Sequence, residues 1–351
     1  MKRIRSFDIA RSLCMLWIVG VWHMCSGYLR IPITNSAFCS AVTGGVLTAF
    51  FFMSGALANS RAIKRGGTFK WVKHKVMKLY PLYLISAVVL YFFGFYKSTG
   101  QMIATALCVG EFFPPMVGTI WFIEILLLFF VISPLFLFEE TSRRSRYIKL
   151  AAGLLIYILL AAEHVTLAYL DERVLLYYPA YVLGLYHRPV INRINEGNGP
   201  QMWKRAAGFL LCAGGFTVLA VFCTGLNSLW WLSTVRGMLF AYSLLFLSGL
   251  LSRIPFLLSA ASVIGYSSTF AYLFHRQVFG ALRSVFGFFS PVFAYCVALP
   301  GLLVCSYFGQ KVYDRIQSSV QHRPGIEAGR PEGAAPAELP AGSTETPDGE
   351  R

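Results

Sequence analysis

Three ionisable side chains, Asp8, Arg11 and His23, lie in the apolar segment near the start of the sequence. An ionisable side chain in hydrocarbon costs several kcal/mol unless it is paired or hydrated, so such residues in a membrane helix are candidates for function. Asp8 and Arg11 are three residues apart, share a helix face and can neutralise each other. His23 lies about 18 Å beyond Arg11 along a helix. Its imidazole could act as a general base, as a nucleophile that forms an acyl-imidazole, or simply as a hydrated interfacial residue beside Trp22.

A dense run of basic residues follows the second apolar segment and leads into Leu79-Tyr80-Pro81-Leu-Tyr83. Setting the orientation of a membrane protein needs only a few of these charges. The surplus suits a polyphosphate such as coenzyme A, or anionic lipid headgroups, and the charge alone favours neither. The basic residues of this segment are Arg61, Lys64, Arg65, Lys70, Lys73, His74, Lys75 and Lys78.

Further ionisable residues lie in later apolar segments. Glu124, in Trp121-Phe-Ile-Glu124, could be structural at a helix N-terminus, or could line a polar cavity with His23. Arg236 has no acid nearby in the sequence, so its partner is expected to be Glu163 or Glu124. The pair His275-Arg276 ends another apolar segment, where His275 could equally be an interfacial residue.

The composition explains where these residues must lie. The chain has 351 residues, of which 56% are hydrophobic and 13% charged, whereas a soluble domain carries about 25% charged residues. Runs of roughly 20 apolar residues predict an all-α, polytopic integral membrane protein with about ten transmembrane helices. The predicted segments are 7–27, 41–59, 79–96, 119–138, 148–168, 174–187, 206–224, 229–252, 258–280 and 287–309.

The positive charges predict the orientation of this bundle. With the N-terminus inside, 25 of the 31 Lys and Arg residues fall on the cytoplasmic side, so both termini are predicted to be cytoplasmic. This asymmetry accounts for the net charge of +15 without any nucleic acid. The eight cysteines are scattered, and no Cys/His spacing suggests a metal site. Residues 1–311 are predicted to form one membrane domain, and residues 312–351, rich in Gly, Pro, Ala and Glu, a disordered cytoplasmic tail.

Several short motifs occur in a distinctive order along these segments. They are the FDIAR pattern with His23, Phe51-Phe-Met-Ser-Gly55, the basic run into Leu79-Tyr80-Pro81-Leu-Tyr83, Ile120-Trp121-Phe122, Ser133-Pro134, and Ala271-Tyr272-Leu273-Phe274-His275. In these motifs the chain resembles, over residues 3–311, the membrane-bound acyltransferase 3 family of bacterial enzymes that O-acylate cell-envelope glycans.

The resemblance implies an acyl donor, usually acetyl-CoA, that binds from the cytoplasm, and a sugar hydroxyl as acceptor near the outer half of the inner membrane. The family's helix 1 arginine and histidine correspond to Arg11 and His23, and its loop arginines to Lys75 and Lys78. Lysine keeps the charge at the loop positions but lacks the bidentate fork of arginine.

The spacing of Arg11 and His23 also departs from the family pattern. Eleven residues separate them here, where the family usually has ten. In a regular α-helix this change moves the two side chains from about 20° to about 120° apart around the axis. A π-bulge that takes up the extra residue would return both to one face.

These observations predict a membrane O-acyltransferase that moves an acyl group, expected to be acetyl, from acyl-CoA to a glycan hydroxyl. The alternative is a transporter or flippase for a glycan or a lipid-linked intermediate, which would not need acyl-CoA. Acyl-CoA is expected as a co-substrate, with no permanently bound cofactor or metal; the expected partners are membrane lipids and the glycan acceptor, and the oligomeric state stays open. The predicted residues are His23, Arg11, Asp8 and Glu124 for catalysis, Arg65, Lys73, Lys75 and Lys78 for the donor, and Arg236, Trp121 and His275 for the substrate pathway.

Overall fold

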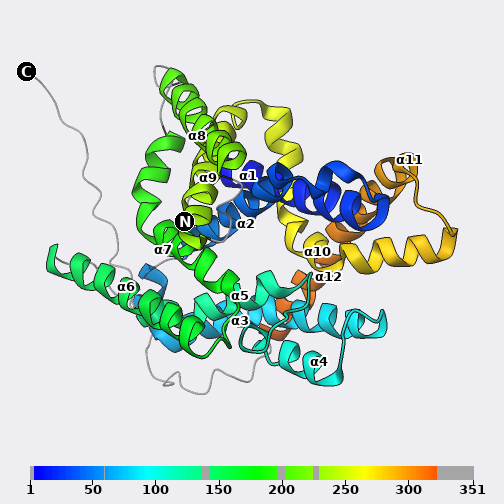
Figure 1. The fold of residues 1–351 in the computed structure, drawn as a ribbon, viewed down its shortest axis with the longest axis horizontal. Coiled ribbons are helices and arrows are strands. Elements are labelled where there is room, and N and C mark those ends of the chain that lie inside the picture. Colours follow the sequence, from blue (N-terminus) through cyan, green and yellow to red (C-terminus); the bar gives the residue numbers. More distant parts are fainter. Residues whose placement is uncertain (1–3, 59, 136–142, 197–201, 224–228, 322–351) are drawn as a thin grey trace, which may run out of the picture.

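A computed structural model describes residues 4–58, 60–135, 143–196, 202–223 and 229–321 (Figure 1). Within these ranges the chain is helical and contains no strand. Eight helical segments of the described residues are long and apolar enough to cross a membrane. They are Arg5–Leu29, Ala37–Leu57, Gly67–Phe92, Tyr147–Thr166, Met202–Phe222, Trp230–Leu251, Pro255–Phe286 and Pro291–Ser319.

The all-helical, multi-pass architecture is therefore confirmed, while the count of ten crossing helices and the orientation of the termini remain predictions. Each of the eight segments matches one of the ten predicted ones. The other two also fall in helices. Segment 119–138 corresponds to the short helix α5 (Trp121–Ile132), followed by the 3₁₀ turn η4 (Ser133–Leu135). Segment 174–187 lies inside α7 (Glu172–Glu196).

The centre of the bundle is α2 (Ala37–Leu57), which packs against α7 and α9 (Trp230–Leu251). The backbones of α2 and α7 touch, because glycines face each other at the crossing. A Cβ on Gly55 would collide with the carbonyl oxygen of Tyr181, and a Cβ on Gly184 with that of Phe52. Membrane helices have no hydrophobic driving force to associate, so small residues that permit this close approach stabilise the contact.

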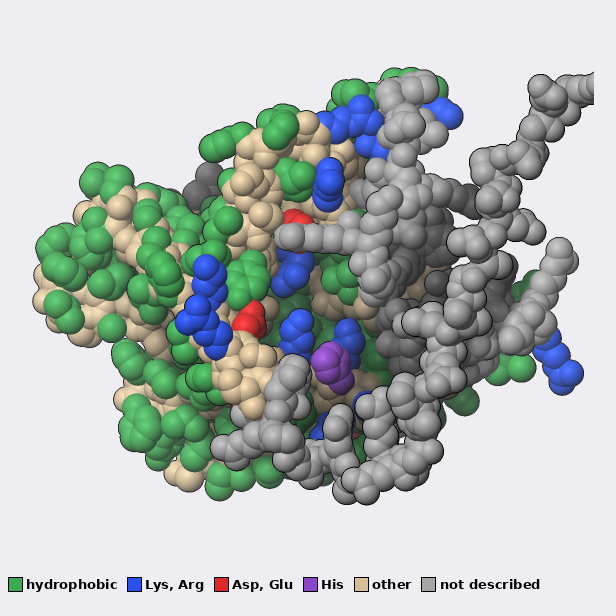
Figure 2. All heavy atoms as spheres, turned by 180° about the vertical axis from the view of Figure 1, so that it is seen from behind, with side chains coloured by type: hydrophobic (Ala, Val, Ile, Leu, Met, Phe, Trp, Pro, Cys, Tyr) green, Lys and Arg blue, Asp and Glu red, His purple; other side chains and the backbone are tan. Residues whose placement is uncertain are grey.

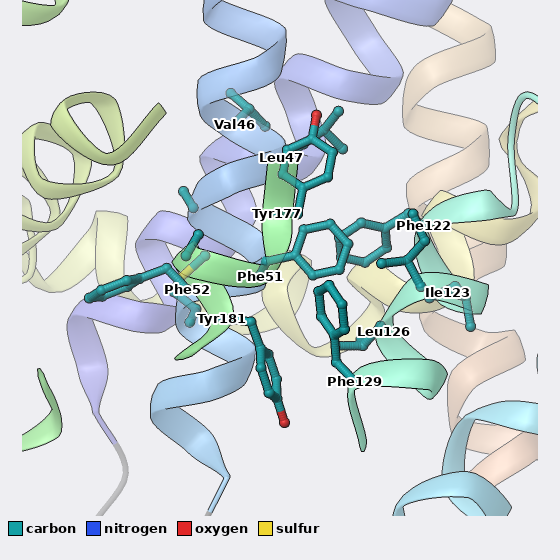
Figure 3. Close-up of a cluster of buried hydrophobic side chains, with 14 of the residues drawn as sticks. Val46, Leu47, Phe51, Phe52, Phe122, Ile123, Leu126, Phe129, Tyr177 and Tyr181 are labelled. Atoms are coloured by element: carbon teal, nitrogen blue, oxygen red, sulfur yellow. The ribbon is translucent and has the colours of Figure 1, made fainter. Parts of the chain in front are cut away.

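A cluster of aromatic rings fastens α5 and α7 to α2 (Figure 3). The ring of Phe51 lies with its centroid 4.6 Å from Phe122, 5.4 Å from Phe129 and 4.9 Å from Tyr177. Such ring pairs contribute about 0.5–1.5 kcal/mol each beyond their buried area. The motif Phe51-Phe-Met-Ser-Gly55 therefore provides the central ring of this cluster and the glycine of the contact between α2 and α7.

A second group of helices packs on the other side of α1 (Arg5–Leu16). This group consists of α10 (Pro255–Phe286), α12 (Leu299–Gln321) and α3 (Ser60–Phe92). Helix α10 contacts the other two and also α1. Two side-chain hydrogen bonds join α3 to α10. The Ser86 hydroxyl donates to the Leu273 carbonyl at 2.8 Å, and Gln277 Nε2 donates to Ser86 Oγ at 2.9 Å.

Helix α12 continues to Gln321, past the predicted end of the membrane domain at residue 311, so residues 312–321 are helical. The rest of the predicted tail, residues 322–351, lies outside the described residues. The periphery is formed by α6 (Arg143–Thr166) and α8 (Met202–Phe222). In the apolar window of α6 only 11% of residues are buried, so most of its side chains face outward, as suits contact with lipid. The remaining elements are η1 (Trp17–Leu29), η2 (Pro32–Asn35), α4 (Thr99–Ala106), η3 (Gly110–Phe112), α11 (Pro291–Phe293) and η7 (Ala294–Ala298).

Candidate active site

A cavity of about 450 Å³ lies between α1, α2, α3, α5, α10 and α12. Asp8 and Arg11 line it from α1, and Lys75 and Lys78 from α3. The structure thus brings together two of the predicted catalytic residues and two of the predicted donor-binding residues. Of the other two donor-binding candidates, Lys73 is exposed and outside this lining, and the side chain of Arg65 lies outside the described residues.

The lining of this cavity is mixed in charge. Figure 2 shows Lys and Arg side chains gathered around a hollow on one face of the molecule, with acidic side chains between them. In the cavity, Asp314 of α12 accepts hydrogen bonds from the Tyr266 hydroxyl at 2.5 Å and from Gln310 Nε2 at 2.9 Å. Two neutral donors therefore hold this carboxylate on the wall that α10 and α12 form.

Lys75 is held by aromatic rings. Its Nζ lies 5.7 Å from the ring centroid of Trp71 and 5.4 Å from that of Phe130. Among the described residues no carboxylate lies within ion-pair distance of Lys75. An ammonium group held by ring faces alone keeps its hydrogen-bond donors for an anion.

The spacing left open whether a π-bulge takes up the extra residue in helix 1, and the structure has a π-helix there. Helix α1 passes at Trp17 into η1, a π-helix that continues to Leu29 and contains His23. The i→i+5 turns of a π-helix each take up about one residue more than an α-turn. The extra residue between Arg11 and His23 is therefore absorbed by wider winding, over a longer stretch than a single bulge.

The contacts on α10 show that Arg11 and His23 share a face. Arg11 Nη2 donates to Ser268 Oγ at 3.0 Å, and His23 meets His275 and Arg276. Ser268 and His275 are seven residues apart, which is about two turns of one helix face. Both side chains of α1–η1 therefore point to the same side of α10.

His23 lies against two residues of α10. Its ring centroid is 4.7 Å from that of His275, and its Nδ1 is 3.2 Å from Nη2 of Arg276. His275 is completely buried, its Nδ1 lies 2.6 Å from the Tyr272 carbonyl, and its Nε2 has no hydrogen-bond partner among the described residues. The predicted pathway residue His275 is thus a direct neighbour of the predicted base.

The cavity and His23 are adjacent rather than continuous. His23 is not part of the cavity lining, but Tyr272 is, and its ring centroid lies 6.0 Å from that of His275. The cavity therefore ends one helical turn of α10 before the two histidines. A thin substrate arm that entered beside Lys75 would have to pass Tyr272 to reach His23.

Glu124 does not join His23, so the predicted shared polar cavity is not found. Glu124 is completely buried, and its Oε1 lies 2.7 Å from the hydroxyl of Tyr83, which also lies 2.6 Å from the Thr105 carbonyl. The reason is the direction of each side chain. Glu124 points towards α3 and the α4 region, whereas His23 points towards α10.

Trp121 and Arg236 also lie apart from His23 in the described contacts. The ring of Trp121 stacks on Tyr177 at 5.8 Å and carries the guanidinium of Arg173 at 4.6 Å. The described hydrogen bond of Arg236 is a long one, 3.5 Å, to Ser233 on its own helix.

The prediction that Glu163 or Glu124 pairs with Arg236 is wrong. Glu163 Oε2 instead accepts the backbone N–H of Leu170 at 3.0 Å. Glu124 is engaged by Tyr83, as described above. Each acid already accepts a hydrogen bond from another residue, and neither approaches Arg236 within ion-pair distance in the described structure.

Glu111 is a buried acid that the sequence did not single out. It lies in η3 between α4 and α5, is 1% exposed, and its carbonyl accepts the backbone N–H of Asp171 at 2.8 Å. Burial, together with the nearby negative charge of Asp171, raises the pKa of Glu111 to about 7. No local sequence pattern announces the burial of Glu111.

Replacing Glu111 with glutamine should stabilise the protein in a pH-dependent way. Between the ordinary pKa of 4.5 and the raised pKa of about 7, Glu111 is protonated in the folded protein but ionised in the unfolded chain. The stability of the folded protein therefore falls as the pH rises across this range. Glu111→Gln removes this loss, worth about 3 kcal/mol. Thermal unfolding in detergent should therefore give similar Tm values for the two proteins near pH 4.5, and a higher Tm for the variant at pH 8. Glu172→Gln, at an exposed carboxyl, is the control. A difference in Tm between Glu111→Gln and the wild type that is the same at both pH values would contradict the prediction.

Comparison with known proteins places the chain in a family. The family model described as an acyltransferase domain matches residues 4–309. No curated protein and no solved structure matches the chain. The match covers most of the chain and includes α1, η1, the cavity helices α3 and α5, all of α10 and the first half of α12. The chain therefore belongs to the acyltransferase 3 family of membrane acyltransferases.

Proposed function

We propose that this protein is a membrane O-acyltransferase that moves an acyl group, in the simplest case acetyl, from acyl-CoA to a hydroxyl of a cell-surface or lipid-linked glycan. The observation that carries the proposal is the cavity that Asp8, Arg11, Lys75 and Lys78 line together. Family membership supports acyl transfer, and the cavity supports an anionic donor.

Lys75 and Lys78 are proposed to bind the phosphates of the donor. Both are point charges on flexible stems, so they suit a phosphate group without demanding one orientation. Lys75, held against two aromatic rings, is the more confined of the two. From there the pantetheine arm would extend along the cavity towards Tyr272 and bring the thioester to His23.

His23 is proposed to act at the thioester, either as a general base or as a nucleophile. As a base, it takes the proton of the acceptor hydroxyl while that oxygen bonds to the thioester carbonyl carbon. The C–S bond then breaks, and the leaving thiolate receives the proton from the imidazole. As a nucleophile, the imidazole first accepts the acyl group, releases the thiol and passes the acyl group to the hydroxyl in a second step.

The orientation is part of the proposal. Asp8 and Arg11, near the start of α1, line the cavity, whereas His23 lies further along the same span. The excess of basic residues supports a cytoplasmic location for the end of the bundle that carries the cavity. We therefore assign the protein to a bacterial inner membrane, with the donor site inside and the acceptor at the outer half. Lipids and the glycan are its proposed partners.

Replacing both Lys75 and Lys78 with alanine should weaken acetyl-CoA binding about tenfold to a hundredfold, because two charge-assisted phosphate contacts are lost. Binding to the purified protein can be measured by titration with labelled acetyl-CoA and displacement by free CoA. Lys73→Ala is the matched control, since Lys73 lies on the same helix but is exposed and outside the cavity lining. Equal affinity in the double variant and in the wild type would contradict the assigned donor site.

A transfer assay tests the function itself. Membranes that contain the protein are incubated with labelled acetyl-CoA and extracted glycans, and the label is followed into the glycan fraction. Label in a glycan, present only with the protein, is the expected result. A transporter or flippase would instead give no saturable acetyl-CoA binding and no label transfer.

A further inference from the structure

Arg276 lies beside the proposed base without a carboxylate of its own. Its Nη2 is 3.2 Å from His23 Nδ1, and its guanidinium carbon lies 5.8 Å from the ring centroid of Phe95. In the described structure no acidic side chain lies within ion-pair distance of it. A guanidinium has five N–H donors, so most of them are left for another partner.

The contact defines the state of His23. A guanidinium only donates hydrogen bonds and keeps its proton, so His23 Nδ1 must be the acceptor. The ring proton of a neutral His23 then sits on Nε2. The lone pair on Nδ1 is the only basic site of that ring, and Arg276 occupies it.

The backbone of Arg276 is anchored, whereas one side of its guanidinium is open. The Tyr28 hydroxyl donates to the Arg276 carbonyl at 2.9 Å, which anchors the residue on α10. The guanidinium lies beside Gly118, where even an added Cβ would be 3.8 Å and 3.9 Å from its two terminal nitrogens. Because Gly118 carries no side chain, the guanidinium is not enclosed on that side.

We propose that Arg276 is a catalytic residue of the transfer site that also caps the basic nitrogen of His23 while the site is empty. When the thioester arrives, the guanidinium turns to the carbonyl oxygen that becomes negative and leaves Nδ1 to take the hydroxyl proton. This inference rests on the proposed function of His23 as a base. In the step, the hydroxyl oxygen bonds to the carbonyl carbon, Nδ1 takes the proton, Arg276 binds the oxyanion, and the thiol departs with the proton from His23.

Carbethoxylation by diethyl pyrocarbonate tests the cap without any acyl donor, because the reagent attacks the free lone pair of an imidazole. In the purified full-length protein, Arg276→Met keeps the length of the side chain but removes the donors. His23 should then react about tenfold faster than in the wild type, as expected for losing a hydrogen bond to a charged group. Arg283→Met, an exposed arginine two turns further along α10, should react like the wild type.

His275 provides an internal control in the same experiment, because it is completely buried beside His23. Peptide mass spectrometry reports both histidines separately. A faster reaction at His23 alone supports the cap. Equal rates at His23 in wild type and variant overturn it, and so does a parallel rise at His275, which would mean general loosening of the helices.

Kinetics test the second half of the proposal. Arg276→Met should lower kcat by about a hundredfold, as for the loss of an oxyanion donor, with an unchanged KM for acetyl-CoA. Arg276→Lys should recover part of the rate, because it restores a charged donor. An unchanged kcat would overturn the role at the oxyanion. If instead His23→Ala retained full activity, the assigned base would be wrong, whereas the carbethoxylation result would still stand.

Discussion

Replacing His23 with alanine is expected to lower the rate of acyl transfer by about a thousandfold, the contribution of a well-placed general base. The reason is geometric. His23 shares the α10-facing side of its helix with Arg11, and it lies one turn of α10 beyond the cavity in which the donor is proposed to bind. Acetyl-CoA affinity should stay at the wild-type level, because the lysines of the cavity are untouched.

The measurement is the initial rate of label transfer from acetyl-CoA to glycan in membranes with matched protein amounts. His74→Ala is the control, since His74 is exposed on α3 next to Lys75 and does not line the cavity. Undiminished transfer in His23→Ala would rule out both chemical roles. If transfer is lost, exchange of labelled CoA into acetyl-CoA by the wild type in the absence of glycan separates the two. Exchange indicates a covalent acyl-imidazole, and its absence indicates a base.

The second large effect concerns folding. Gly55→Ala should destabilise the protein by about 3 kcal/mol or more, at the upper end of overpacking costs, because the added methyl would meet the backbone of α7 at Tyr181 rather than a side chain that can rotate away. Backbone in the middle of a helix has no alternative position. Most of the variant should therefore aggregate on detergent extraction.

Size-exclusion chromatography after heating compares the variants. Gly44→Ala is the matched control, because Gly44 lies on the same helix with nothing within 4 Å of an added Cβ. It should be neutral or more stable by about 1 kcal/mol, the helix preference of alanine. A Gly55→Ala protein that melts like the wild type would show that α2 and α7 are less closely packed than described.

The helices could be predicted from the sequence because their signal is local. A run of apolar residues identifies a membrane helix whatever it packs against. The errors are local too. Helix α3 was predicted to begin at residue 79, yet its apolar span starts at Gly67. The lysines of its first turns lower the hydropathy without interrupting the helix, so the prediction began too late.

The lining of the cavity could be predicted in part. Arg11, Lys75 and Lys78 were singled out by their type and order, and all three line it. The conflict between eleven residues and one helix face pointed to irregular winding. Partners on different helices could not be found. Arg276 meets His23 across 253 positions of sequence, and nothing near either residue specifies that contact. The alternative that placed Glu124 in a cavity with His23 was wrong for the same reason, since depth in the membrane says nothing about direction around a helix.

The winding of η1 has a consequence for how the sequence of this region can change in length. In a regular α-helix one inserted residue turns every later side chain by about 100° and would move His23 off its partner helix. A helix that can redistribute residues between α and π turns absorbs the insertion locally. The loop after Leu29 and all helices beyond it then keep their places. Gains or losses of single residues between Trp17 and His23 are thus compatible with one arrangement of the site, and residue spacing alone is a poor guide to which chains share it.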